Sequence, residues 1–209
     1  KPYADISTAY GQYNTLLLSG AAGTGIMKSG LSLDARYSYV KSDGYIRNGK
    51  VDHKNIYAAL SHYSDRQLIR LIYMNGIQHT GITWEGIDPS MLAINRRYNP
   101  AGEYEDDNGN TRYYDNETDN YRQNHYHLLW EQQLSDRWKT ETTFHYTKGK
   151  GYYENYKQID ENDEWAPHFS NYNIQQPIIN GIPLEKADLI RKKWLDNDFY
   201  GVVSNLYGN

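Results

Sequence analysis

Hydrophobic and polar positions alternate with period two along several stretches of the chain, a pattern that predicts β-strands. The clearest example is Leu31–Val40, where the odd positions are apolar and most even positions are ionic or hydroxylic. Further strands are expected at about 3–21 (interrupted at Gly11), 55–63, 67–79, 126–134 and 138–147, and from Phe199 onward. For 55–63 two apolar faces qualify: Ile56/Ala58/Leu60 and Tyr57/Ala59/Tyr63.

The connections between these stretches are alternately short and long. Ser64-Asp65-Arg66 and Ser135-Asp136-Arg137 are tight polar turns, whereas two excursions, about 80–124 and about 150–197, are long and rich in Tyr, Asn and Asp. The second excursion is expected to hold one short helix, Pro183–Leu195, with Pro at its start and an apolar stripe. Tight turns at one end of a sheet and long loops at the other are typical of outer-membrane β-barrels.

The second tight turn fixes the register of its hairpin. Opposed residues of an antiparallel pair point to the same face, and the apolar residues on both sides of this turn are even-numbered, so the turn must hold an odd number of residues. The three-residue turn pairs Leu134 with Trp138, Leu128 with Phe144, Tyr126 with Tyr146, His127 with His145, and Glu131 with Glu141. Because neighbouring carboxylates are costly in a dry core, the polar face is expected to be hydrated.

Composition narrows the function classes. The chain has 22 Tyr and only 3 Phe, and tyrosine suits both pleated strands and a boundary between water and lipid. No apolar run reaches the roughly 18 residues of a spanning helix, which excludes an α-helical membrane protein. The 209 residues contain no Cys, and the formal net charge is −4 with scattered basic residues. Disulfides, a cysteine nucleophile and nucleic-acid binding are therefore not expected.

Several stretches resemble TonB-dependent outer-membrane receptors, in particular their iron-complex branch. They follow one another through nearly the whole chain: Tyr10–Thr15, Ser42–Tyr45, Tyr114–Tyr121, His145–Tyr153 and Trp194–Asn197.

The resemblance implies an all-β fold in which residues 1–209 form an antiparallel up-and-down meander, part of a transmembrane β-barrel with long extracellular loops. In this family a plug domain lies inside a barrel of about 22 strands, and energy arrives through the TonB complex. Neither the plug nor the C-terminal strands are recognisable here, so an internal part of the barrel is expected. The implied function is uptake of a scarce nutrient across the bacterial outer membrane, first of all a ferric siderophore, with haem, cobalamin and an oligosaccharide left open. Partners would be the TonB complex, the metal complex or other nutrient, and outer-membrane lipid.

Aromatic side chains in the long loops are the candidate ligand contacts, because their faces suit sugar rings and flat metal complexes. The candidates are Trp84, Tyr113, Tyr114, Tyr121, Tyr152, Tyr153 and Trp165. The same side chains could instead pack the loops together or form an interfacial aromatic girdle. No resident cofactor or metal is expected.

Other polar groups are expected to be structural. His125, His127 and His145 share a face and could bind a metal, but no compact metal motif supports them, which favours a hydrated wall. The segment 106–110 has a calcium-like composition without EF-hand spacing, which favours a solvated turn. The sequence has no nucleophile elbow, P-loop or zincin motif, so an enzyme is not expected.

Three alternatives differ from this interpretation. A secreted carbohydrate-binding β-sandwich would bury its apolar strand faces in one core. A receptor of the same family could import a glycan instead of a metal complex. A polysaccharide-cleaving enzyme could use Glu131 and Glu141, but two adjacent positions on a wall lack a closed pocket.

Overall fold

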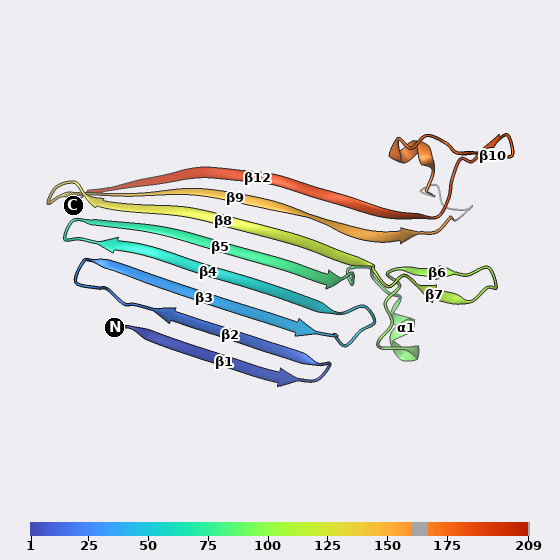
Figure 1. Ribbon diagram of the computed structural model, residues 1–209, viewed down its shortest axis with the longest axis horizontal. Helices are drawn as coiled ribbons and strands as arrows, with labels where there is room; N and C mark the ends of the chain where they lie inside the picture. Colours follow the sequence, from blue (N-terminus) through green and yellow to red (C-terminus); the bar gives the residue numbers. More distant parts are fainter. Residues whose placement is uncertain (160–166, 209) are drawn as a thin grey trace.

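The computed structural model describes residues 1–159 and 167–208. One large antiparallel sheet has the strand order β1-β2-β3-β4-β5-β8-β9-β12 (Figure 1). The strand bounds are Tyr3–Gly11 (β1), Thr15–Gly23 (β2), Leu31–Ser42 (β3), Val51–Tyr63 (β4), Gln67–Gly81 (β5), Thr118–Gln133 (β8), Trp138–Lys157 (β9) and Leu189–Gly208 (β12). The strands of the large sheet lie side by side in the order in which they occur along the chain, so the predicted all-β up-and-down meander is confirmed. The sheet does not close on itself, because β1 and β12 do not pair with each other.

The small elements gather at one end of the sheet. They are α1 (Pro89–Ile94), the β6–β7 hairpin (Glu103–Glu105 and Thr111–Tyr113), the 3-10 helix η1 (Phe169–Tyr172) and the β10–β11 hairpin (Ile178–Ile179 and Ile182–Pro183). Figure 1 places both termini and the tight turns at the opposite end. We call these the loop end and the turn end. None of the helices in the described ranges has the length and apolar character to cross a membrane.

The predicted register of the β8–β9 hairpin is confirmed. Leu128 lies opposite Phe144, Tyr126 opposite Tyr146, His127 opposite His145, and Glu131 opposite Glu141. Lys139 lies between the two carboxylates, with its Nζ 2.9 Å from Glu131 and 2.6 Å from Glu141. This shared ammonium offsets the repulsion that the pairing of two glutamates would otherwise cause.

The predicted helix Pro183–Leu195 is wrong. Pro183 ends β11, and Leu189–Leu195 open β12, which pairs with β9 along its whole length and starts well before the predicted Phe199. Ile190 and Trp194 have helical spacing, but they face Tyr156 and Tyr152 across the strand pair. Twenty residues of cross-strand pairing outweigh a weak local helix preference. The long loops are correspondingly shorter than expected and span 82–117 and 158–188.

The first predicted stretch is two strands. A turn at 12–14 separates β1 from β2, and its residues Tyr13 and Asn14 adopt positive φ angles of 59° and 52°. The interruption predicted at Gly11 coincides with the end of β1, but the period-two pattern does not show that the chain reverses there, because the alternation continues on both sides.

The two faces of the sheet differ in chemistry. One row across the sheet holds Leu33, Leu60, Leu71, Leu128, Phe144 and Val202. The neighbouring row toward the loop end holds Tyr73, Tyr126, Tyr146 and Tyr200, which we call the tyrosine row. We call the face that carries these two rows the leucine face. The opposite face, which carries Asp34, His127 and His145, is called the histidine face. The register settles the open question at β4, since Ile56, Ala58 and Leu60 lie on the leucine face.

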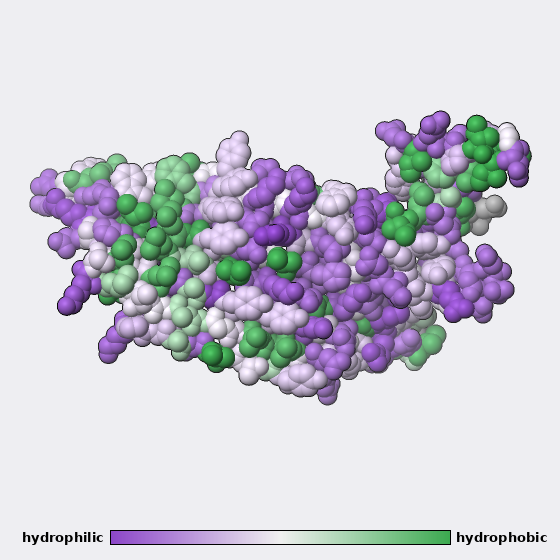
Figure 2. Space-filling view, viewed as in Figure 1, coloured by the Kyte–Doolittle hydropathy of each residue, from purple (hydrophilic) through white to green (hydrophobic). Residues whose placement is uncertain are grey.

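Exposed apolar residues on the leucine face form a diagonal band. On β12, β9, β8 and β5 the first charged or amide residues, namely Asp198, Lys148, Asn124 and Asn75, directly follow the tyrosine row. On β4 the first charge, Lys54, comes one row later, and on β3 Lys41 comes two rows later. Figure 2 shows hydrophobic atoms over the turn-end half of β12 and over the middle of the first strands, mostly hydrophilic atoms on the strands toward the loop end, and a separate hydrophobic cluster at the β10–β11 hairpin. The loop-end border of the band is therefore level across β12, β9, β8 and β5 and inclined to the hydrogen-bonding direction from β5 to β3.

No second large sheet covers either face within the described residues. The buried hydrophobic side chains there are only Ala59, Ile82, Ala101 and Phe169, whereas Leu71 and Phe144 are 50% and 44% exposed. A β-sandwich would bury the leucine row in a common core, and this sheet leaves it open.

Candidate functional site

The structure divides the aromatic candidates between loops and strands. Trp84 lies in the loop 82–117 and is 58% exposed, Tyr113 ends β7, and Tyr114 follows it. Tyr121 lies on β8, and Tyr152 and Tyr153 lie on β9, so their assignment to loops is wrong. The reason is that β8 and β9 run further toward the loop end than the alternation indicated. Trp165 lies outside the described residues.

A hollow of about 630 Å³ at the loop end brings three of these candidates together. Its lining residues are Gln78, Asp119, Tyr121, Gly151, Tyr152, Tyr153, Lys193, Trp194 and Leu195. By strand alternation most of them lie on the histidine face, whereas Tyr152 and Trp194 lie on the leucine face, with ring centroids 4.6 Å apart. An adjoining hollow of about 410 Å³ shares Gln78 and Asp119 and includes Trp84.

Trp84 and Tyr153 form the aromatic centre of this region. Their ring centroids are 5.6 Å apart in an edge-to-face arrangement, and the Lys193 ammonium lies 5.8 Å from the Tyr153 ring centroid. The Asp119 carboxylate accepts a hydrogen bond from Gln78 at 3.4 Å. The hollow thus combines flat aromatic surfaces with a cation and a hydrogen-bonding rim, which suits a ligand with planar groups and negative charge.

Tyr121 has a packing role as well as a lining role. Its hydroxyl donates to Asn197 at 3.1 Å, and its ring lies across Gly149 and Gly151 of β9. A Cβ at Gly151 would meet Tyr121 Cα at 2.7 Å, so only glycine lets this tyrosine lie flat on the strand. Tyr121 therefore shapes the floor of the hollow.

Tyr113 and Tyr114 fasten the loop 82–117. The Arg47 guanidinium lies 3.7 Å from the centroid of the Tyr113 ring, and its Nε donates to the Asn99 carbonyl at 3.0 Å. The Tyr114 hydroxyl donates to Glu154 at 2.5 Å. Burial, followed by this hydrogen bond, raises the pKa of Tyr114 to about 12. The structure supports the packing interpretation for these two residues.

Glu117 is the anchor that sequence reasoning missed. It is 2% exposed, its carboxylate accepts from Asn155 Nδ2 at 2.5 Å and from the Tyr156 backbone N–H at 2.9 Å, and its own carbonyl accepts from Asn48 at 2.7 Å. Burial raises its pKa, against the opposing effect of these hydrogen bonds. Nothing in the sequence distinguishes Glu117 from the exposed acids around it, because its partners lie on β9 and in the β3–β4 loop.

The remaining polar candidates lie on the histidine face and in the turn 106–110. The His127 and His145 ring centroids are 6.3 Å apart, and His125 shares a hydrogen bond with Thr147 at 2.9 Å. Among the described residues, no group of three or more His, Cys, Asp or Glu could hold a metal ion. The Asp106 carboxylate accepts from the backbone N–H groups of Asn108 and Asn110 at 3.0 and 2.9 Å, so the segment 106–110 is a turn stabilised by its own aspartate.

The candidate site is therefore the loop-end hollow with Trp84 and Tyr153, supported by a loop that Glu117 and Arg47 hold in place. No protein-family model matches the chain, and comparisons with curated proteins and with solved structures found no significant match.

Proposed function

We propose that this sheet is an arc of the wall of an outer-membrane β-barrel of the TonB-dependent receptor type. The diagonal band of exposed apolar residues on the leucine face carries the proposal. Strands of outer-membrane barrels are inclined by about 35–45°, so a membrane of constant height crosses successive strands at shifted positions. An apolar band that a tyrosine row borders from β12 to β5, and whose border shifts toward the loop end from β5 to β4 and β3, supports contact with lipid.

In this proposal the leucine face meets lipid and the histidine face lines a hydrated interior. The loop end is extracellular, because long loops of such barrels lie outside the cell and short turns face the periplasm. The two unpaired sheet edges, β1 and β12, would pair with further strands of the barrel, since barrel closure removes exposed edges.

We propose further that the loop-end hollow contacts a scarce nutrient during uptake powered by the TonB complex. The aromatic pair Trp84 and Tyr153 beside the Lys193 ammonium favours an anionic ligand with planar groups, of which a ferric siderophore is the first candidate. The aromatic pair alone also favours a glycan, because sugar rings stack on aromatic faces. The charge of Lys193 distinguishes these ligands, because it attracts an anionic siderophore and not a neutral glycan.

The membrane orientation is tested with single-tryptophan variants reconstituted into vesicles of brominated phosphatidylcholine. Bromine in the acyl chains quenches only tryptophans that reach the hydrocarbon. Trp130, which is 36% exposed on the leucine face, is expected to be quenched, and Trp84 at the loop end is not. Unquenched Trp130 in a folded sample would overturn the barrel proposal.

The ligand class is tested by titrating the reconstituted protein with a ferric catecholate siderophore, haem, cobalamin and a neutral oligosaccharide. Quenching of Trp84 by the siderophore, weakened by Lys193→Gln, is the expected result. If only the oligosaccharide changes Trp84 fluorescence and Lys193→Gln has no effect, the ligand is a glycan.

A further inference from the structure

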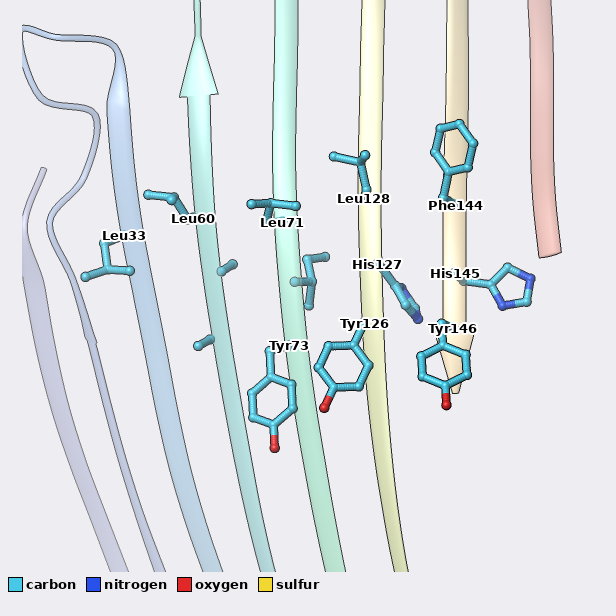
Figure 3. A pocket seen from close by; sticks show the side chains of 13 residues that line it. Leu33, Leu60, Leu71, Tyr73, Tyr126, His127, Leu128, Phe144, His145 and Tyr146 are labelled. Atoms are coloured by element: carbon cyan, nitrogen blue, oxygen red, sulfur yellow. The ribbon is translucent and has the colours of Figure 1, made fainter. Parts of the chain in front are cut away.

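A groove crosses the leucine face beside the tyrosine row. Its volume is about 490 Å³, and it runs over β3, β4, β5, β8 and β9 (Figure 3). Leu60, Leu71 and Leu128 border it on one side, and Tyr73, Tyr126 and Tyr146 on the other. The small side chain of Ala58 lies in the same row as Tyr73 and leaves the space open. The lining also includes His127 and His145, but these alternate onto the histidine face, so the side chains that border the groove on the leucine face are leucine, phenylalanine, alanine and tyrosine, which suit a hydrocarbon chain.

The tyrosine row turns its polar atoms toward the loop end. The Tyr73 hydroxyl donates to Asn124 at 3.1 Å, and the Tyr146 hydroxyl donates to Asp198 at 2.5 Å. Beyond it, Lys148 pairs with Asp196 at 2.6 Å and with Asp198 at 2.8 Å. The leucine face therefore changes from apolar to ionic within two rows, as a surface at the boundary between acyl chains and headgroups would.

The row that follows Lys148 toward the loop end holds two cations that have fewer carboxylate partners than Lys148. Arg122 on β8 lies directly opposite Lys150 on β9, and like charges in such a pair repel each other. Within the described part of the chain Lys150 has one ion-pair partner, Asp196, at 3.2 Å, and Asp196 also pairs with Lys148. No residue in the described ranges forms an ion pair with Arg122, which is exposed. An anion between Arg122 and Lys150 would relieve the repulsion.

The groove and the cation pair lie on the same two strands. Six residues separate Leu128 from Arg122 along β8, which corresponds to about 20 Å at roughly 3.4 Å per residue. With the strands inclined as in outer-membrane barrels, this spacing places the groove at the depth of an acyl chain below a headgroup phosphate.

We propose that this surface binds one phosphorylated lipid of the outer leaflet, with an acyl chain in the groove and a phosphate between Arg122 and Lys150. The proposal rests on the proposed function, because it requires the leucine face to meet lipid. Arginine suits the role, since its planar guanidinium donates two parallel hydrogen bonds to phosphate.

Trp194 is a built-in reporter for the test. It is 59% exposed on the leucine face, and the Lys150 ammonium lies 6.0 Å from its ring centroid. A variant that retains Trp194 as its only tryptophan is reconstituted into phosphatidylcholine vesicles and titrated with lipid A, with fully dephosphorylated lipid A, and with inorganic phosphate. The expected result is a saturable change in Trp194 fluorescence with lipid A only.

Substitutions then locate the phosphate. Arg122→Gln is expected to weaken the lipid A response about fivefold, since a basic residue near an anionic surface contributes roughly 1 kcal/mol. Arg122→Lys is expected to restore most of the response. Arg137→Gln is the matched control, because Arg137 is also exposed but lies in the turn at the opposite end of the same hairpin.

The outcomes separate this proposal from the proposed function. An equal response to dephosphorylated lipid A, or an unchanged response in Arg122→Gln, would overturn the phosphate site. Quenching of Trp130 by brominated lipid would in that case still support the barrel proposal. An equal response to inorganic phosphate would overturn the lipid and leave a site for soluble phosphate. Without quenching of Trp130, the membrane orientation itself would fail.

Discussion

The turn-end half and the loop-end half of the sheet are made of the same strands but depend on different interactions. In the turn-end half the leucine face exposes Leu71 and Phe144, and on the opposite face the buried Ser61 accepts a hydrogen bond from Arg70 at 2.8 Å. In the loop-end half Glu117, Glu154 and Asn155 are buried at 2%, 3% and 3% exposure and join the strands to the loop 82–117. The difference indicates that buried hydrogen bonds stabilise the loop-end half, whereas under the proposed function lipid would stabilise the exposed leucine face of the turn-end half.

The largest expected effect is the destabilisation caused by a charge on the leucine face of the turn-end half. Leu128→Arg places a charge in the apolar band, and we expect it to destabilise the protein in phosphatidylcholine vesicles by about 2–4 kcal/mol, the cost of arginine near a bilayer midplane. Asn124→Arg, four residues closer to the loop end on the same face, is expected to cost about 0–1 kcal/mol. Urea unfolding of both variants in vesicles measures the difference.

Leu129→Arg is the control for the opposite face. Leu129 neighbours Leu128 but alternates onto the histidine face, where the proposal expects water. Equal destabilisation by Leu128→Arg and Leu129→Arg would contradict an assignment of lipid to one face only.

The second effect concerns the anchor of the loop half. Glu117→Ala removes two hydrogen bonds to a carboxylate and leaves the Tyr156 N–H and Asn155 amide without their acceptor, so we expect the loop to lose about 2 kcal/mol of protection. Hydrogen exchange at Tyr156 and limited proteolysis of 82–117 measure the loss. Glu117→Gln, which keeps the shape and one acceptor, is expected to lose less. If both variants retain full protection, Glu117 does not anchor the loop.

The third effect concerns ligand binding at the loop end. Trp84→Ala removes one half of the aromatic pair with Tyr153, and we expect binding of the ferric siderophore to weaken about tenfold, or roughly 1.4 kcal/mol. Trp84→Phe keeps an aromatic edge and is expected to weaken binding less. Titration followed by Tyr fluorescence or calorimetry measures both. The structural control is Trp138→Phe at the turn end, which is expected to leave binding unchanged.

The two halves also differ in how far the sequence predicts them. The β8–β9 register followed from alternation and the parity of one turn, because a strand with one apolar face permits only one alignment at Leu128 and Phe144. The extension of β9 to Lys157 and of β12 back to Leu189 could not be predicted, since both faces of these segments mix apolar and polar residues, and Ile190 and Trp194 have helical spacing. Glu117 and Arg47 were missed for a related reason: their partners come from distant segments, and only the folded chain brings them together.

The smallest expected effect is the pH dependence of hydrogen-exchange protection in the loop 82–117. Hydrogen bonds from the Asn110 backbone and from Arg112 lower the pKa of Asp106 to about 2. The folded turn therefore favours the ionised carboxylate, and its contribution is present above the ordinary aspartate pKa of about 3.9 and is lost as the pH falls toward 2. Glu117 behaves in the opposite sense, because burial raises its pKa and its contribution is lost as the pH rises. Acidification from pH 5 toward 2 should thus lower the protection factors of the Asn108 and Asn110 amides, measured against the intrinsic exchange rate at each pH, while Tyr156 stays protected. Asp106→Asn should abolish this pH dependence, and Asp107→Asn should preserve it. If acid instead lowers protection at Tyr156 together with Asn108 and Asn110, the loop responds to acid as one unit and the carboxylates of Asp106 and Glu117 do not act separately.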